Sequence, residues 1–167
     1  MSGTKKSEIF LTRDMKLRFS PSEVKNHLDT TFVSPETKRE YKIFETLLHF
    51  FPSEFTPKDY LQKLPKKYIK EYIEEEDVIH ETVLMTEDDV SEEIIIQTIK
   101  FLLKNGAPIT IEAIDEAIWF DLRTVVEFLL RKGGREIYLE HHKNPLEFKM
   151  LAYDSMKYFI KKGLKKN

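Results

Sequence analysis

Few residues of this chain have the type and spacing that catalysis or metal binding needs. His141 and His142 are adjacent, but neighbouring helix positions face different directions, so we expect an ordinary polar loop rather than a metal site. The acidic run 74–77 lacks the alternation and the Gly of a calcium-binding loop. The chain has no Gly-rich phosphate loop, no Gly-x-Ser-x-Gly elbow and no cysteine. We therefore predict that the protein is not an enzyme and has no catalytic residues, metal or cofactor.

Trp119 and Phe120 are the strongest candidates for binding by residue type. Side by side they could form a stacking platform for a base or for a protein partner. On a helix as apolar as the one that contains them, large aromatic side chains more often belong to the core. The sequence leaves two alternatives for this pair: Trp119 and Phe120 lie buried under Ile95 and Ile99, or they form a surface that a partner contacts.

The composition is that of one globular domain, 1–167. The 167 residues are 41% hydrophobic and 34% charged, which is enough for a core, and the net charge is -2. No apolar run approaches the ~20 residues of a membrane span. The polar start "MSGTKKSEIF" lacks the apolar region of a signal peptide. We expect a cytoplasmic or nuclear protein without a membrane partner.

The charges are unevenly distributed along the chain. Residues 71–93 include eleven acidic side chains and no Lys or Arg, whereas the tail from Lys149 carries six lysines and one acidic residue. Such segregation can steer a charged partner or a second copy of the chain into a homo-oligomer. The simpler interpretation is that these charged residues lie on solvated helix faces and loops. Nucleic-acid binding by the tail is a weaker alternative, because no exposed aromatic residues are evident among the lysines.

In the first half of the chain, alternation over 9–19 predicts a β-hairpin. Ser20–Pro21 is a helix-start signal, with Ser at the N-cap and Pro at the first helical position. Similar Ser-Pro and Thr-Pro pairs predict helix starts near 35 and 57. A helical apolar face is expected over 41–51, and Pro65 should break the third helix.

The second half is expected to be mostly helical. Asp121 is a plausible cap between two helices, and Gly133-Gly134 should end the second of them. The predicted elements are a short strand over 81–86, a helix from the Ser91 cap to Gly106, a helix pair over 111–118 and 122–130, and a final helix over 145–163. With the first half, this makes about seven helices and three short strands.

Three similar phrases recur near the end of the chain. "IKFLLKNG" (99–106), "VEFLLRKG" (126–133) and "MKYFIKKG" (156–163) have Gly-to-Gly spacings of 27 and 30 residues. They resemble the second helix of ankyrin repeats, which ends in a similar Leu-Leu-x-x-Gly phrase. Ankyrin units are about 33 residues long and open with a Thr-Pro-Leu-His turn, which this chain lacks. The resemblance implies a short helical-repeat binding protein.

Three other segments together resemble the BTB/POZ fold of the Skp family and elongin C. "IFLTRDMKLRFSPSEV" is similar to the family's strand, turn, strand and first helix. "ETVLMTEDDVSEEIIIQTIKFL" is similar to its later strand, acidic turn and central helix, and "EAIWFDLRTVVEFL" to its closing helix pair. The resemblance implies an α+β, predominantly helical domain with a small N-terminal sheet. Its core would cover about 8–134 with a helical insertion at about 25–57, followed by a C-terminal helix and basic tail over 144–167.

This second resemblance accounts for more of the chain and is the one we prefer. It implies a non-enzymatic adaptor that links a partner or substrate receptor to a cullin-type ubiquitin ligase. Large aromatics and Arg tend to carry interface energy. The residues expected to contact an F-box-like receptor are Trp119, Phe120, Leu122 and Arg123.

Overall fold

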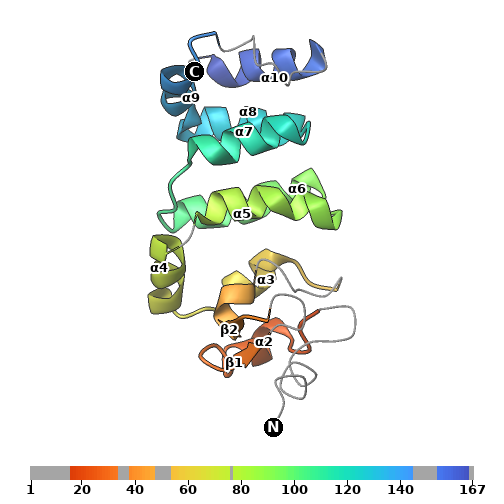
Figure 1. Cartoon of the computed structure of the whole chain (residues 1–167), viewed down its shortest axis with the longest axis vertical. Helices are drawn as coiled ribbons and strands as arrows, with labels where there is room; N and C mark the ends of the chain where they lie inside the picture. Colours follow the sequence, from red (N-terminus) through yellow and green to blue (C-terminus); the bar gives the residue numbers. More distant parts are fainter. Residues whose placement is uncertain (1–15, 34–37, 48–53, 76, 145–153, 166–167) are drawn as a thin grey trace. The chain divides into compact units, whose positions relative to one another are not determined.

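The computed structural model describes residues 16–33, 38–47, 54–75, 77–144 and 154–165 (Figure 1). The described chain is predominantly helical with a small antiparallel sheet, which confirms the predicted α+β class at this level. The sequence suggests one domain, and the structure divides into two compact units, Met1–Tyr72 and Ile73–Asn167.

The first unit contains short elements that begin at well-defined caps. They are α2 (Pro21–Val24), β1 (Thr31–Val33), β2 (Glu40–Lys42), η1 (Ile43–Thr46), α3 (Pro57–Leu61) and the start of α4 (Lys66–Glu75). At α3, Thr56 accepts a hydrogen bond from the Asp59 amide at 3.3 Å, and its own amide donates to the Asp59 carboxylate at 2.7 Å. This reciprocal capping explains why the helix starts at Pro57. The starts at 21 and 57 and the break at Pro65 are confirmed.

The two described β-strands lie in segments for which the sequence predicts no strand. β1 and β2 pair antiparallel with Phe32 opposite Tyr41, and the Phe32 side chain is buried. The predicted helix over 41–51 is therefore wrong at its start, where β2 and a 3-10 turn stand instead. The residues needed for a helix start near 35, and most of the predicted hairpin 9–19, lie outside the described residues. Of that hairpin's described residues, 16–19, only Leu17 forms a β-bridge.

Tyr60 on α3 links two parts of the first unit. Its side chain is fully buried, and its hydroxyl donates to the Phe19 carbonyl at 2.7 Å. Burial, followed by the nearby Glu54 and Asp59 carboxylates, raises the pKa of Tyr60 to about 12. The phenol is thus held neutral, with its polar end paired and its ring in the core.

The second unit is built from helices. They are α5 (Val78–Leu84), η2 (Met85–Asp88), α6 (Glu92–Lys104), α7 (Ile111–Trp119), α8 (Arg123–Leu129), the π-turn η3 (Leu130–Gly134), α9 (Arg135–His141) and α10 (Asp154–Leu164). The predicted strand 81–86 is wrong, because this segment belongs to α5 and η2. Val78, Ile79, Thr82 and Val83 are buried at helical spacing, which appears only when the window extends back to 78.

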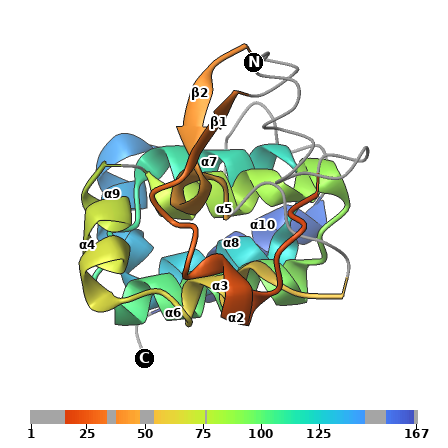
Figure 2. The ribbon, with the colours of Figure 1, turned by 90° about the horizontal axis from the view of Figure 1, so that it is seen from below.

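Pairs of these helices stack on one another. α5 packs against α6, and α7 packs against α8; α5 also packs against α7, α6 against α8, α7 against α9 and α8 against α10. We call α5, α7 and α9 the first-helix row and α6, α8 and α10 the second-helix row. In Figure 2, α5 and α7 lie on one side of this unit and α6 and α8 on the other. The unit is therefore a short stack of helical hairpins.

Small residues allow close packing within the stack. Ala113 and Ala117 on α7 are fully buried. A Cβ atom added at Gly163 on α10 would lie 2.6 Å from the Leu130 Cβ atom, so α10 approaches the end of α8 at a distance that only glycine permits. Gly133 adopts a φ of 119° and ends α8 as predicted, since a side chain is disfavoured there. The chain then resumes as α9, and the polar loop expected at 141–142 is wrong at His141, which is helical.

Helix caps also connect neighbouring hairpins. Asp77 caps α5 by accepting from the His80 amide at 3.2 Å, and its other oxygen accepts from the Thr110 hydroxyl at 2.7 Å. The same Thr110 oxygen accepts from the Ala113 amide at 3.3 Å and so caps α7. From α6, the Glu92 carboxylate accepts from the Thr124 amide at the start of α8, at 3.2 Å. The predicted Ser91 cap of α6 is confirmed, with the Ile94 amide 3.3 Å from its oxygen.

Candidate protein-interaction surface

An exposed stripe of side chains runs along α7. Its members are Glu112, Asp115, Glu116 and Trp119, and intervals of three, four and seven residues place them on one face of the helix. Glu112 and Trp119 are exposed, and the two carboxylates between them are partly exposed. The other face of α7 carries the fully or largely buried Ala113, Ile114, Ala117 and Ile118. Packing of that face in the stack leaves the α7 stripe facing solvent.

Trp119 ends this stripe and does not belong to the core. Its side chain is 57% exposed, and among the described residues only Trp119 and Tyr158 are large hydrophobic side chains exposed to this degree. Phe120, at the helix C-cap, is partly exposed. The alternative that places Trp119 beneath Ile95 and Ile99 is therefore wrong, although both of those isoleucines are fully buried.

The turn between α7 and α8 fixes the other two predicted contact residues. Asp121 has a left-handed φ of 56°, and Arg123 donates to both of its carboxylate oxygens, at 3.2 and 3.0 Å. The sequence suggested Asp121 as the cap of α8, and this prediction is wrong. Leu122 holds the cap position, without a side-chain hydrogen bond. Leu122 is 7% exposed, so it can offer little area to a partner, whereas Arg123 is partly exposed.

Two histidines contact the carboxylates of the α7 stripe. The His142 Nε2 atom lies 2.8 Å from Asp115, and the His80 Nε2 atom lies 3.5 Å from Glu116. His142 also packs its ring at 4.7 Å from the buried ring of Tyr138 on α9. Burial, followed by the Asp115 charge, raises the pKa of Tyr138 to about 12. No local sequence signal identifies these contacts, because His80 lies on α5, the carboxylates lie on α7, and His142 follows the end of α9.

A second exposed aromatic residue lies in a basic setting. Tyr158 on α10 is 56% exposed. The Lys162 ammonium lies 5.1 Å from the centre of its ring and 3.6 Å from the Glu127 carboxylate. Exposed Lys161 is on the same helix. The sequence did not indicate an aromatic residue exposed among these lysines, because Tyr158 is part of an apolar phrase.

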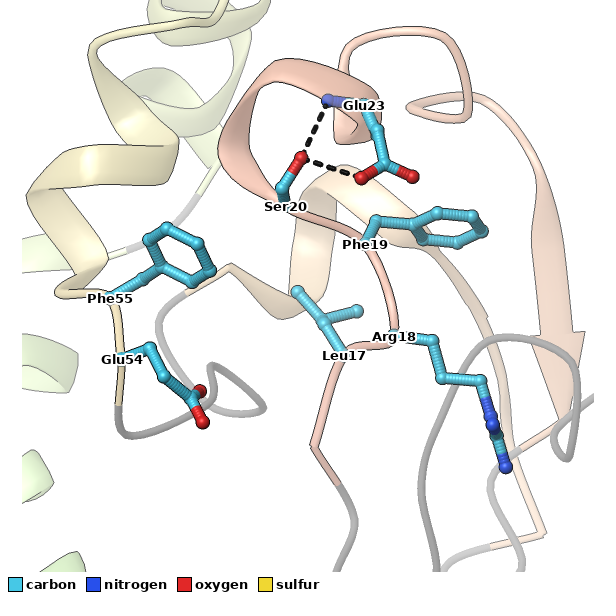
Figure 3. A pocket seen from close by; sticks show the side chains of 7 residues that line it. All are labelled: Leu17, Arg18, Phe19, Ser20, Glu23, Glu54 and Phe55. Carbon is cyan, nitrogen blue, oxygen red and sulfur yellow. Dashed lines mark hydrogen bonds between the residues drawn. The ribbon is translucent and has the colours of Figure 1, made fainter.

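The first unit contains an open depression of about 410 Å³ (Figure 3). Phe19 and Phe55 contribute to its lining, together with the cap of α2. In that cap the Ser20 hydroxyl donates to the Glu23 carboxylate at 2.8 Å and accepts from the Glu23 amide at 3.4 Å. Figure 3 shows the Arg18 side chain pointing away from the carboxylate of Glu54, also in the lining. The Ser20 hydroxyl in this lining is therefore engaged in capping α2.

Among the residues that the structure describes, no group of three or more His, Asp or Glu side chains could hold a metal ion. In the same part of the chain, none of the helices combines the length and the apolar character needed to cross a membrane. Comparison of the chain with protein-family models, with curated proteins and with solved structures gives no significant match. The α7 stripe and the turn that follows it are the best-defined candidate site for binding.

Proposed function

We propose that this chain is a non-enzymatic protein-binding module that contacts its partner through the α7 stripe and the turn after it. The observation that carries the proposal is the 57% exposure of Trp119 at the end of a helix whose other face is buried. Trp and Arg are over-represented among residues that dominate binding energy. The paired Asp121 and Arg123 side chains hold the adjoining turn in one conformation, which lowers the entropy lost on binding.

The stacking of hairpins favours an ankyrin-like repeat as the architecture of this module. The recurring phrases end at Gly106, Gly133 and Gly163, and they fall on the second-helix row, α6, α8 and α10. Each first helix packs on the next first helix, and each second helix on the next second helix. Such stacks bury a continuous core between repeats and bind partners on the surface that the repeats share.

A photo-crosslinking amino acid at position 119 tests the proposal. The matched control carries the same amino acid at Tyr158, which is almost equally exposed at 56% but lies on α10. We expect position 119 to yield a discrete crosslinked protein that position 158 does not yield. The purified partner should then bind the intact chain and lose affinity for Trp119→Ala. Crosslinks that are identical at both positions, or absent from both, would rule out this surface.

The role at a cullin-type ubiquitin ligase is a narrower proposal, which the Skp and elongin C resemblance implies. It has less structural support, because the segment 81–86 that it requires as a strand is helical. Its test is affinity purification of the intact chain followed by mass spectrometry. Recovery of a cullin together with an F-box-like receptor supports the adaptor role, and recovery of neither removes it while leaving protein binding by Trp119 intact.

One observation favours nucleic acid as a second candidate partner. Tyr158 is exposed on α10 near Lys161 and Lys162, and single strands bind where bases stack on aromatic rings beside basic side chains. Binding of a labelled mixed-sequence oligonucleotide at low salt is the test. Tyr158→Ala should weaken it by about 1–3 kcal/mol, whereas Trp119→Ala should not change it. An intact chain that binds no oligonucleotide at low salt removes this candidate.

A further inference from the structure

The first-helix row and the second-helix row carry opposite charge. Residues 77–89, 111–121 and 135–141, which form the first-helix row and its adjoining turns, contain eleven acidic side chains and one Arg. The second-helix row, with the π-turn, contains eight Lys or Arg and four acidic side chains. The acidic run 71–93 thus supplies only part of the acidic side chains of the first-helix row, which come from three segments far apart in the chain.

The single Arg of the first-helix row, Arg135, does not neutralise the negative charge of this row. The Arg135 guanidinium donates to the Leu164 carbonyl at 2.7 Å and to the Glu136 carboxylate at 3.2 Å. His80 and His142 lie close to Glu116 and Asp115, and Glu112 is exposed and forms no ion pair with another described residue. Carboxylates collected on one face raise the local concentration of cations and favour a cationic partner.

Within the α7 stripe, Trp119 adds an aromatic ring that favours Arg and Lys side chains of a partner. The face of an indole ring attracts a guanidinium or ammonium group, and Trp is the best aromatic acceptor for such contacts. Glu116 and Asp115 precede Trp119 by one helical turn, and Glu112 precedes it by two. A cation on the ring therefore lies near a carboxylate as well, and a second cation can pair with Glu112.

We propose that the α7 stripe docks an extended segment of a partner protein in which two Arg or Lys residues lie three positions apart. Trp119 follows Glu112 by seven positions, which corresponds to about 10.5 Å along the helix. In an extended polyproline II segment, side chains three positions apart share a face and are separated by about 9 Å. One cationic side chain stacks on Trp119 and the other pairs with Glu112. This inference rests on the proposed protein-binding function and names the chemistry of the partner.

The test uses the purified full chain and three labelled peptides in a neutral Gly/Ser background. The first has two Arg residues three positions apart, the second has the same two Arg residues adjacent, and the third has Glu in place of both. Fluorescence anisotropy at low salt measures binding. We expect the first peptide to bind about threefold more tightly than the second, because only the first reaches Trp119 and Glu112 together. We expect no binding of the third. Trp119 is the only tryptophan of the chain, so its emission gives an independent signal of contact.

Two variants and one control localise the contact. Trp119→Ala and Glu112→Gln should each weaken binding of the first peptide about two- to fivefold, as expected for an exposed cation–π contact and an exposed ion pair. Tyr158→Ala, which removes an almost equally exposed aromatic ring from the second-helix row, should leave binding of the first peptide unchanged. Equal binding of all three peptides, or an equal effect of the three substitutions, overturns the proposal.

Two further results separate this inference from the function on which it rests. A partner that crosslinks to position 119 while neither Arg peptide binds leaves the protein-binding function standing and removes the cationic segment. Sedimentation of the chain alone tests a second copy as the occupant, since the second-helix row is basic. Self-association that Trp119→Ala abolishes, without binding of the first peptide, would show that the α7 stripe docks another copy instead.

Discussion

The link between Asp77 and Thr110 gives the sharpest test of how consecutive hairpins are held together. Asp77 caps α5 through the His80 amide and accepts from the Thr110 hydroxyl, which itself caps α7. Asp77→Ala removes a cap and leaves Thr110 without its acceptor. Loss of an N-cap costs about 1 kcal/mol. Loss of a hydrogen bond to a charged group costs about 1.5 kcal/mol, at the low end because Asp77 is partly exposed.

We therefore expect Asp77→Ala to lower the free energy of unfolding by about 2–3 kcal/mol. For a chain of this length the midpoint of thermal unfolding should fall by about 5–10 °C. Urea unfolding followed by Trp119 fluorescence is the suitable assay, because the only tryptophan lies in the second unit and reports on it specifically. Asp77→Asn is the matched control. It keeps one oxygen to accept from the His80 amide and places an NH2 group beside the Thr110 hydroxyl, which can accept from it, so its loss should be smaller than that of Asp77→Ala.

A double-mutant cycle with Thr110→Val separates the two roles of Asp77. If the hydrogen bond between these side chains is as the structure shows, the cycle should give a coupling of about 1 kcal/mol. Asp77→Ala without a measurable loss, or single losses that add fully in the double variant, would show that this hydrogen bond does not hold the hairpins together. The hairpins would then be held together by their apolar contacts alone.

Three further predictions concern packing, capping and pH. Gly163→Ala should lower the free energy of unfolding by about 1–3 kcal/mol, because the added Cβ atom would lie 2.6 Å from the Leu130 Cβ atom and overpack the contact. We expect this loss despite the better helix propensity of Ala, and thermal unfolding followed by circular dichroism measures it. Glu92→Ala should cost about 1 kcal/mol, because amides at the start of α8 lose their acceptor, and Glu92→Gln should recover most of this loss in the same assay. Burial and the Asp115 charge raise the pKa of Tyr138 to about 12, whereas the unfolded phenol ionises near 10. The Tyr138 phenol therefore keeps its proton to higher pH in the folded state, so this group does not affect stability below pH 10 and lowers it between pH 10 and 12. In urea unfolding followed by Trp119 fluorescence, Tyr138→Phe should show a smaller fall in stability over this range, and an identical fall would contradict the prediction.

Helix starts were the most predictable part of the fold. The caps at Ser20, Thr56 and Ser91 depend on residues within three positions of each other, so a local pattern is sufficient. The break at Pro65 is equally local, because Pro cannot continue the hydrogen-bond pattern of a helix. Predictions failed where a short window was ambiguous. The segment 81–86 taken alone fits a strand, and only its burial beside Val78 and Ile79 makes it part of a helix.

The candidate site shows the same division. The residue types at Trp119 and Arg123 mark the turn after α7 as suited to binding, without any structure. Whether Trp119 faces the core or solvent depends on which side of α7 the neighbouring helices cover. Ala113 and Ala117 allow that close approach on one side, which leaves the α7 stripe exposed. Leu122 was expected at the contact, but it turns inward at the junction and is largely buried.

The sequence alone accounts for the caps at Ser20, Thr56 and Ser91, for the helix ends at Gly106 and Gly133 and for the charge of each segment, because these features depend on neighbours along the chain. Only the tertiary structure decided that α5 and α7 lie side by side, that Asp77 and Glu92 cap across hairpins, and that the acids of three segments share one row. The physical reason is that these contacts join residues about thirty positions apart. No local propensity encodes such a contact, and it arises only when the apolar faces of successive hairpins are buried together.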